Sequence, residues 1–372
     1  MRIGIDARMY GVKAATGIGG YIQNLIDQLA EIDSENEYIL FMNDPAFSEF
    51  RPPTSKFKKI KVNIRWYSWV EQLIFPIILY KHCLNLIHFP NFNTPIFYFK
   101  KSVITIHDIT PIFYPGPMVK KSKIRRLAYW LVLRLSILKA KVVITPSNHT
   151  KDGIVKYLKV KTKKIKVVYL GFDSKLVNRS SQMEIDQVLS KYAITKPYLL
   201  YLGVWRDHKN LVGLIKAFEI LKIKNQLDCQ LVLGGKADPN YPEISQAISE
   251  SPVKNQIIAP GFIPEEELGL IYQGAKLFVL PSFCEGFGLV ALEAIYCQTP
   301  VVSSQSTSLP EVLGDSAVYF DPTNPEDIAQ KVLEVIGNKN LINTMVDRGQ
   351  KQLLKYDWRQ CAQVTLDIYL AA

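Results

Sequence analysis

The stretch 280–303, LPSFCEGFGLVALEAIYCQTPVVS, constrains the fold more than any other, because it encodes most of one parallel α/β unit. The apolar run 277–280 predicts a short buried strand, and the glycines in 286–288 allow a tight turn or a close approach to a ligand. An apolar helix pattern over 289–296 follows, and 300–302 opens the next strand. Ligands of such units bind outside the carboxyl ends of the strands, so this turn is the first candidate site.

Two carboxylates flank the turn, with Glu285 before it and Glu293 inside the predicted helix. The helix start near Gly288 offers unpaired backbone N–H groups and a positive dipole end, which favour a diphosphate. From Gly288 to Glu293 the helix rises roughly 8 Å, at about 1.5 Å per residue. We therefore predict that the two carboxylates meet opposite ends of an extended ligand, with phosphates between them.

With seven residues between them and the flanks PSFCEGFGL, LEA, TPVV and SLPEV, Glu285 and Glu293 resemble the donor-site signature of retaining glycosyltransferases of family 4. The resemblance covers nearly the whole chain and is strongest at 198–321. It implies the α/β class and the GT-B architecture, in which two Rossmann-like doubly wound domains face a central cleft. The alternative is an ordinary strand–turn–helix with two solvated glutamates.

The resemblance also implies a domain organisation. Residues 1–175 are expected to form a Rossmann-like acceptor-binding domain, and residues 196–355 a Rossmann-like domain that binds the nucleotide sugar. A polar segment over about 174–196 is predicted to be the linker, and a terminal helix in 356–372 is expected to pack back on the first domain. A length of 372 residues suits two or three domains, and a hydrophobic content of 48% is enough for large cores.

Composition indicates where the protein resides. No apolar run reaches the ~18 residues of a membrane span, and residues 1–11 carry a charge inside their only short apolar run, which argues against a signal peptide. The five cysteines are scattered and include no C-x-x-C pair, so neither a zinc site nor a disulfide framework is predicted. We therefore expect a cytoplasmic protein with reduced thiols.

The charge is unevenly distributed. Residues 1–180 hold 29 Lys or Arg and 12 Asp or Glu, net +17, and the totals of 45 and 34 leave 16 and 22 for 181–372, net −6. Basic residues in 51–69 lead into aromatic and aliphatic ones, which is typical of an interfacial membrane segment and equally compatible with a packed helix. Residues 118–141 are predicted to form a basic amphipathic helix. A basic acceptor domain suits a lipid-diphosphate-linked acceptor at the inner face of the plasma membrane, so peripheral membrane association is a further expectation.

A glycine cluster follows the first predicted strand, 1–6. Gly17, Gly19 and Gly20 are expected in a loop that leads into a helix starting at Tyr21, which repeats the phosphate-binding arrangement. Members of the resembling family use this loop to approach the donor diphosphate, whereas the alternative is a plain turn.

His107 and Asp108 end a predicted strand over 103–108, where sites of α/β proteins form. The pair resembles the family's V-x-x-x-H-D segment, whose histidine contacts the transferred sugar. We interpret both residues as catalytic, and the alternative is a histidine satisfied by local hydrogen bonds.

Arg206 and Lys209 are cations at the carboxyl end of the predicted strand 198–203, suited to neutralise phosphate. Lys209 and Asn210 match a Lys-Asn pair of the family, but His208 stands where the family usually has Arg. The alternative is a basic surface loop. The other predicted donor-binding positions are a glycine after the next strand, an aromatic residue in the loop that resembles the family's base-binding loop, and three residues of the central turn: Gly234, Phe262, Phe287, Gly288 and Leu289.

The resemblance implies a role for each group. Glu293 would hold the ribose hydroxyls, Arg206 and Lys209 the diphosphate, and Glu285 and His107 the sugar. The reaction would be a retaining transfer by front-face attack, and without an Asp-x-Asp motif we expect neither a metal nor another cofactor. With SLPEV and GDxAxxFDP, the chain looks most similar to family members of bacterial surface polysaccharide assembly. That resemblance implies transfer of a hexose, with mannose from GDP-mannose favoured, to a saccharide or lipid-linked saccharide in surface polysaccharide or lipopolysaccharide synthesis.

Three other functions fit the same residues. A nucleotide-sugar epimerase would share the architecture and release free sugar without an acceptor, and a phosphorylase would need a lysine-bound pyridoxal cofactor. The basic half is also compatible with nucleic-acid binding, but its cations are spread over several elements and no recognised nucleic-acid module is present, so we expect no nucleic-acid partner.

Overall fold

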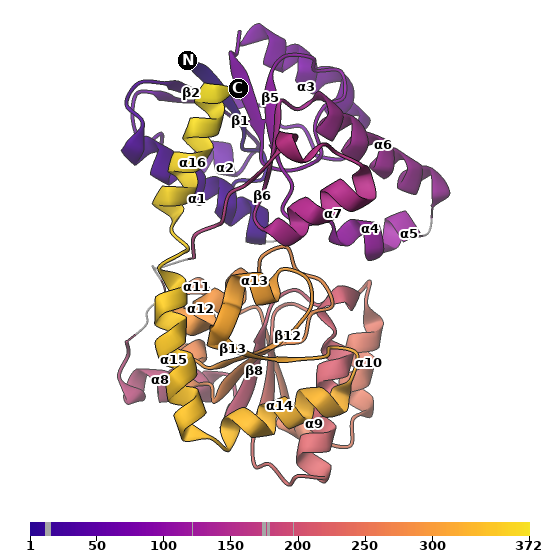
Figure 1. The fold of residues 1–372 in the computed structure, drawn as a ribbon, viewed down its shortest axis with the longest axis vertical. Coiled ribbons are helices and arrows are strands. Elements are labelled where there is room, and N and C mark those ends of the chain that lie inside the picture. Colours follow the sequence, from indigo (N-terminus) through magenta and orange to yellow (C-terminus); the bar gives the residue numbers. More distant parts are fainter. Residues whose placement is uncertain (12–15, 121, 173–175, 177–178, 196) are drawn as a thin grey trace. The chain divides into compact units, whose positions relative to one another are not determined.

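The computed structural model of the chain describes residues 1–11, 16–120, 122–172, 176, 179–195 and 197–372. The chain divides into two compact units (Figure 1). Unit 1 comprises Met1–Gly171 and Tyr356–Ala372, and unit 2 comprises Phe172–Lys355. The break after Gly171 falls just before the predicted end of the first domain at 175.

Unit 1 contains a seven-stranded, entirely parallel sheet with the order β3-β2-β1-β4-β5-β6-β7. Its strands are β1 Arg2–Asp6, β2 Glu37–Met42, β3 Phe57–Lys61, β4 Leu86–Phe89, β5 Ser102–Thr105, β6 Val142–Thr145 and β7 Ile165–Val167. The central strands are short and largely apolar, as expected for a sheet covered on both faces, although β4 carries the buried His88. The chain order reverses between β1 and β4, which makes this position the topological switch point of the unit.

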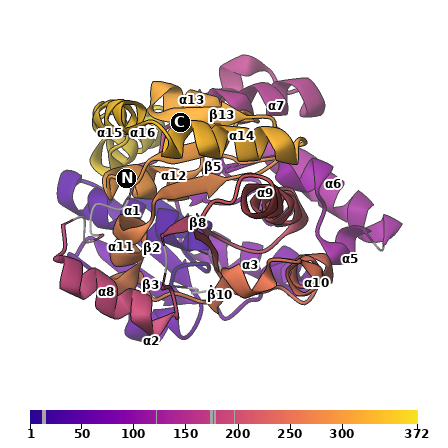
Figure 2. The ribbon, with the colours of Figure 1, turned by 90° about the horizontal axis from the view of Figure 1, so that it is seen from below.

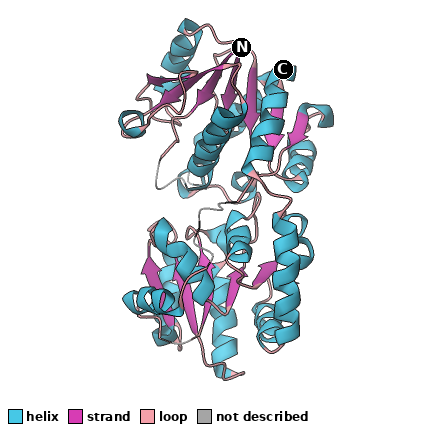
Figure 3. Cartoon of the chain, turned by 90° about the vertical axis from the view of Figure 1, so that its left-hand side faces the viewer, coloured by secondary structure: helices cyan, strands magenta, loops and turns pink. Residues whose placement is uncertain are grey.

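Helices cover both faces of this sheet (Figure 3). One face packs against α3, α6 and α7, whose buried residues include Phe75, Leu133 and Ile154. On the other face lie α1 and α16, which contact each other (Figures 1 and 2). The helices of unit 1 are α1 Thr16–Ile32, α2 Ala46–Glu49, α3 Trp69–Lys81, α4 Thr110–Phe113, α5 Pro117–Lys120, α6 Lys123–Lys139, α7 Asn148–Leu158, the 3-10 turn η1 Thr162–Lys164, and α16 Trp358–Ala371.

Unit 2 contains a six-stranded parallel sheet with the order β10-β9-β8-β11-β12-β13. Its strands are β8 Tyr198–Leu202, β9 Gln230–Gly234, β10 Ile257–Gly261, β11 Leu277–Leu280, β12 Val301–Ser304 and β13 Ala317–Phe320. Strands β9 and β10 follow β8 towards one edge of the sheet, and β12 and β13 follow β11 towards the other edge. The switch point of this unit therefore lies between β8 and β11.

The helices of unit 2 also lie on both faces of their sheet (Figure 3). Helices α9 and α14 pack together, and α8 with α11 and α12 with α15 form two further pairs. The elements are α8 Gln182–Lys191, η2 Asp207–Lys209, α9 Leu211–Ile223, α10 Pro242–Glu250, η3 Lys254–Gln256, α11 Glu265–Gly274, α12 Leu289–Tyr296, α13 Leu309–Leu313, η4 Gly314–Ser316, α14 Pro325–Ile336 and α15 Lys339–Leu353. Two doubly wound α/β domains are thus confirmed, while a cleft between them stays a prediction.

Several predicted elements were wrong in detail. The glycines 17–20 lie inside α1 rather than in a loop, because the helix begins at Thr16. Strand β5 ends at Thr105, so His107 and Asp108 lie in the loop before α4. Much of the predicted linker is helix α8, whose N-terminus has a capping box between Ser181 and Glu184. The remaining linker residues 174, 175, 177, 178 and 196 lie outside the described part of the chain.

Candidate functional site

The loops after β8 and β11 meet at the switch point of unit 2. The amide N–H of Phe283 donates to the carbonyl of His208 over 2.8 Å. The buried side chain of Asn210 donates through Nδ2 to the carbonyls of Pro281, at 3.1 Å, and Pro322, at 2.7 Å. Asn210 therefore ties the start of α9 to the chain that follows β11 and β13.

Glu285 and Lys209 form an ion pair in these loops. Lys209 Nζ lies 2.6 Å from Glu285 Oε1, and their side chains are 15% and 11% exposed. Ser282 Oγ donates to the same carboxylate oxygen over 2.7 Å. Backbone bonds hold Glu285 as well, since its N–H donates to Thr307 Oγ1 at 2.9 Å and its carbonyl accepts from Ser308 Oγ at 3.0 Å.

The electrostatics keep Glu285 ionised. Burial by itself would raise the pKa of Glu285, but the charge of Lys209 and the hydrogen bonds from Lys209 and Ser282 lower the pKa below its ordinary value. A carboxylate and an ammonium group held side by side at the end of a parallel strand can bind the hydroxyls and the phosphates of one ligand.

The turn after Glu285 leads into α12 through Gly288. This residue has φ 94°, in the left-handed region, and a Cβ here would lie 2.7 Å from Leu309 Cδ2. Only glycine fits without strain, so the predicted tight turn and helix start at Gly288 are confirmed. The side chain of Phe287 is buried and that of Leu289 partly buried, so it is the backbone of the helix start, rather than these side chains, that can face an anion.

Glu293 lies in the second turn of α12. Its Oε2 accepts a hydrogen bond of 2.9 Å from the hydroxyl of Tyr272, a residue of α11. The same hydroxyl contacts the carbonyl of Val290 at 3.0 Å. Tyr272 therefore orients the carboxylate, and the sequence analysis missed it because nothing in a lone tyrosine twenty-one residues upstream indicates this contact.

Glycines line the carboxyl ends of β8, β9 and β10. A Cβ on Gly235 would lie 1.9 Å from the carbonyl oxygen of Gly203, so these two loops touch through their backbones. A Cβ on Gly234 would lie 2.3 Å from Leu202 Cδ2. A side chain at 234 would therefore require Leu202 to move, whereas the predicted approach of a ligand to Gly234 stays a prediction.

Two predicted ligand-binding side chains reach solvent at the same edge of the sheet. Arg206 is exposed at the start of the β8 loop. Phe262 follows β10 and is 62% exposed, which is unusual for a large aromatic side chain. Both are available to a ligand.

In unit 1, His107 lies beside Pro90, with Nε2 3.0 Å from the proline carbonyl. The ring of Tyr21 packs edge-on against it with 4.8 Å between centroids. Burial lowers the pKa of His107, and the Pro90 hydrogen bond and the charge of Asp108 offset only part of this. A neutral ring that donates from Nε2 leaves Nδ1 as an acceptor.

Asp108 accepts from the N–H of Thr110 at 2.9 Å, which gives it a local structural role at the start of α4.

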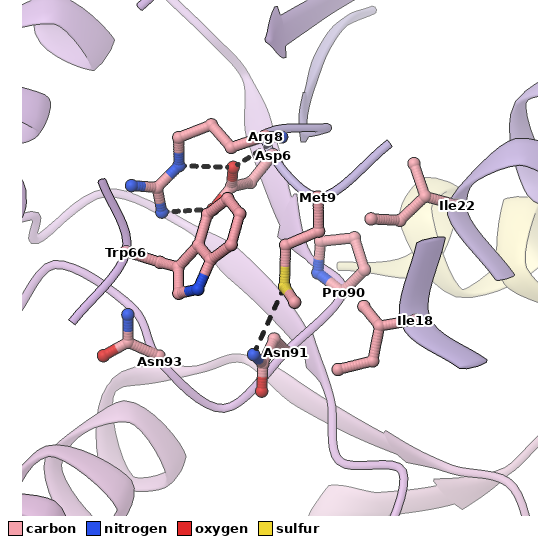
Figure 4. Close-up of a pocket in the computed structure, with 9 residues that line it drawn as sticks. All are labelled: Asp6, Arg8, Met9, Ile18, Ile22, Trp66, Pro90, Asn91 and Asn93. Atoms are coloured by element: carbon pink, nitrogen blue, oxygen red, sulfur yellow. Dashed lines mark hydrogen bonds and ion pairs between the residues drawn. The ribbon is translucent and has the colours of Figure 1, made fainter. Parts of the chain in front are cut away.

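A small pocket lies at the switch point of unit 1 (Figure 4). Its volume is about 10 Å³, comparable to one water molecule. The end of β1 with the loop after it, helix α1, the loop before α3 and the segment after β4 contribute the lining residues, which are Asp6, Arg8, Met9, Ile18, Ile22, Trp66, Pro90, Asn91 and Asn93. Figure 4 shows the guanidinium of Arg8 bonded to Asp6 at one end of the pocket, next to the ring of Trp66.

The charges beside this pocket are buried. Arg8 is 3% exposed and contacts Asp6 at 2.7 Å and Glu71 at 2.6 Å. Asn93 Nδ2 donates to the other oxygen of Glu71 over 2.6 Å. Burial raises the pKa of Glu71, and the opposing effects of Arg8 and Asn93 are smaller. This cluster was not predicted from the sequence, although Asp6 ends the first strand and Arg8 lies two residues after it.

The glycines of α1 lie in the first turns of the helix. At Gly17 and Gly20, no described atom outside the chain neighbours and the backbone of the same helix lies within 4 Å of the position a Cβ would take, and neither backbone is in the left-handed region. Packing within the described chain therefore does not require glycine at these two positions. The structure leaves the predicted ligand contact of Gly17, Gly19 and Gly20 as a prediction.

Family models and a relative of known name both indicate similarity to glycosyltransferases. The family model "Glycosyl transferases group 1" matches residues 184–352, and "Glycosyltransferase Family 4" matches residues 15–176. O-antigen chain mannosyltransferase B of Escherichia coli is 31% identical over 283 residues, which cover 76% of this chain and 73% of that protein.

Solved structures share the fold. Sucrose-phosphate synthase from Thermosynechococcus elongatus has a TM-score of 0.80 at 18% identity, with 100% of both chains covered. Anabaena HepE in complex with UDP and glucose has a TM-score of 0.74 at 18% identity, with 100% of this chain and 99% of that chain covered.

Proposed function

This chain belongs to the family-4 glycosyltransferases, and we propose that it transfers mannose from GDP-mannose to a lipid-linked saccharide, with retention of configuration, in surface polysaccharide synthesis. That the enzyme is a hexosyltransferase follows from its family. The choice of mannose is supported by the Escherichia coli relative, which is named a mannosyltransferase of the O-antigen chain. A structural neighbour bound to UDP and glucose supports a nucleotide-sugar donor as a class.

The observation that carries the proposal is the Lys209–Glu285 pair beside the start of α12. An ammonium group has three N–H donors, so Lys209 can keep its bond to Glu285 and also donate to phosphate oxygens. With the positive dipole end of α12 and with Arg206, it would stabilise the negative charge that develops on the leaving diphosphate. Such preorganised electrostatic contacts are usually the largest catalytic contribution.

The carboxylates would hold the two ends of the donor. Glu293, oriented by Tyr272, would accept hydrogen bonds from the ribose hydroxyls. Glu285 stays ionised, so it would orient the sugar and stabilise positive charge on its ring in the transition state. His107 would donate or accept at a sugar hydroxyl, and Phe262 would stack on the base. Front-face attack assisted by the donor phosphate would give retention.

We propose that the reaction needs no metal ion, because Lys209, Arg206 and the helix start supply the positive charge that a metal would otherwise provide. Transfer in the presence of excess EDTA is then equal to transfer without it. A loss of activity in EDTA that Mg²⁺ or Mn²⁺ restores would contradict this part of the proposal.

The enzyme claim is tested by incubating the protein with a panel of nucleotide sugars and measuring nucleotide release with and without a saccharide acceptor. Release from GDP-mannose that depends on acceptor is expected, and Glu285→Ala should abolish it without loss of helical circular dichroism. Glu243→Ala removes an exposed glutamate of α10 and serves as the matched control. No turnover with any donor would refute the proposal, and free sugar produced without acceptor would indicate an epimerase.

We further propose that the enzyme works as a peripheral protein at the inner face of the plasma membrane, where a lipid-linked acceptor would lie. None of the helices in the described part of the chain is long and apolar enough to cross a bilayer. The basic balance of residues 1–180 supports attraction to an anionic surface.

A further inference from the structure

Helix α3 is apolar on nearly all sides although one side faces solvent. Its inner residues, such as Phe75 and Leu79, are fully buried against the sheet of unit 1. Its outer side exposes large apolar residues, namely Trp69 at 83%, Val70 at 52%, Leu73 at 55%, Ile74 at 46% and Ile77 at 52%. A helix of this kind is normally covered on both sides, so the outer side indicates a missing partner.

Helix α6 exposes a second apolar stripe. The residues follow helical spacing along one side, and they are Ile124 at 81% exposure, Leu127 at 71%, Leu131 at 51% and Leu138 at 61%. Leu133 and Ile137 face the sheet instead. Arg134 lies two helical turns after Leu127, so a cation is placed within the exposed stripe.

The two stripes belong to one surface. Helices α3 and α6 cover the same face of the sheet and lie near each other in Figures 1 and 2. The segment after β4 joins them, because the N–H of Ile96 donates to Gln72 of α3 and its carbonyl accepts from Lys139 of α6. This segment adds Phe97, 49% exposed, and Phe99, 72% exposed. We call α3, the segment 96–99 and α6 the α3–α6 surface.

Charge distinguishes this surface from an ordinary protein interface. Between Arg65 and Lys141 the sequence has twelve Lys or Arg residues and only two carboxylates, Glu71 and Asp108. Glu71 is fully buried in its pair with Arg8 and contributes no surface charge. The cores of protein interfaces are depleted of lysine and their charges are matched in sign by the partner, whereas an anionic bilayer attracts cations around an inserted apolar face.

We propose that the α3–α6 surface docks the protein on a bilayer of anionic phospholipid, with its apolar side chains at the level of the acyl chains and its cations at the headgroup phosphates. Exposed apolar patches of this extent mark interaction sites on soluble proteins. The cations flanking both stripes fit the phosphate layer, which lies just outside the acyl region. This inference rests on the proposed peripheral membrane location and identifies the residues responsible for it.

The test is sedimentation of the full chain with vesicles of phosphatidylcholine alone or mixed with phosphatidylglycerol. Binding to the mixed vesicles that weakens with salt is expected. The double variant Lys123→Gln/Arg134→Gln should bind roughly 25-fold more weakly, about fivefold for each charge removed near an anionic surface. Trp69→Gln/Leu73→Gln should weaken binding at least about tenfold, because large apolar side chains would no longer leave water.

Matched controls separate the surface from general effects. Lys161→Gln/Lys163→Gln removes the same charge from exposed positions at η1 of the same unit, and Leu354→Gln removes an apolar side chain that is 84% exposed in unit 2. Both controls should bind mixed vesicles as the unaltered protein does. If they weaken binding as much as the surface variants, or if the unaltered protein binds no mixed vesicles, the proposal is overturned.

Two further measurements identify the partner. The tryptophan emission of the chain, which has five tryptophans, should shift to shorter wavelength on binding vesicles, and Trp69→Phe should reduce this shift because Trp69 is the tryptophan of the exposed side of α3. A dimer in sedimentation velocity that Trp69→Gln/Leu73→Gln dissociates would overturn the lipid assignment in favour of a second copy of the chain. Nucleotide release with a soluble acceptor and no vesicles is measured in parallel, so that a failure of lipid binding is distinguished from a failure of the proposed transferase activity.

Discussion

Gly20→Ala tests whether a helical glycine is present for a ligand or for packing. Gly20 lies in α1, and apart from its chain neighbours and the backbone of its own helix no described atom is within 4 Å of the position its Cβ would take. Alanine is favoured over glycine inside a helix by about 1 kcal/mol. The substitution should therefore raise the free energy of unfolding by about 1 kcal/mol, and the midpoint of thermal unfolding by roughly 2–4 °C for a domain of this size.

The same substitution should weaken the enzyme. If the first turns of α1 approach the donor diphosphate, an added methyl group in that contact raises the donor KM by roughly tenfold or more. The assays are thermal unfolding followed by circular dichroism and initial rates of nucleotide release over a range of donor concentrations. A more stable protein with an unchanged donor KM would show that Gly20 does not face the donor.

Gly153→Ala is the matched control for the stability change. Gly153 also lies inside a helix, α7, but a Cβ there would be 2.3 Å from Ile109 Cδ1. The same gain in helix propensity is then outweighed by overpacking of the core, which costs about 1–3 kcal/mol. Gly20→Ala should thus stabilise and Gly153→Ala destabilise. Destabilisation by both substitutions would refute the inference that the space beside Gly20 is open.

Three other substitutions test further parts of the structure. Tyr272→Phe removes the hydroxyl that orients Glu293, the proposed ribose-binding carboxylate. It should raise the donor KM and leave kcat unchanged in steady-state kinetics. A lower kcat with an unchanged donor KM would contradict this role. Asn210→Ala removes the donor to the carbonyls of Pro281 and Pro322 and should lower the free energy of unfolding, measured in urea, by about 1–3 kcal/mol. An unchanged midpoint of urea unfolding would contradict this. Burial lowers the pKa of His88 to about 3 in the folded protein. As the pH drops, His88 is therefore protonated in the unfolded chain at a higher pH than in the folded one. The free energy of unfolding should fall as the pH drops from about 6.5 towards 3. His88→Gln should show a smaller loss between pH 7 and 5 in urea unfolding, and an identical loss would refute the assignment.

The elements that the sequence predicted well are those whose residues face a core on every side. Strands such as β8 and β11 are continuous apolar runs, and a buried parallel strand has this pattern regardless of its neighbours. The turn at Gly288 was equally readable, because the backbone conformation there admits only glycine without strain.

The elements that were missed are those in which polar residues dominate. Strand β3, FKKIK, carries lysines because it lies at the edge of its sheet. It falls in the stretch 51–69, which was interpreted as an interfacial membrane segment or as part of a packed helix and not as a strand. Helix α8 is mostly exposed and was interpreted as a linker, although Ser181 and Glu184 have the spacing of a capping box.

Residue patterns along the chain were enough to predict the two parallel α/β units, the alternation of strands and helices, and the motif with Glu285 and Glu293. The folded chain was needed to show which distant side chains meet, as in the pairs of Lys209 with Glu285 and of Arg8 with Glu71. Periodicity along the chain reports which side of an element is buried. Contacts between side chains from different loops depend instead on the order of the strands, and that order is set by the packing of the whole sheet.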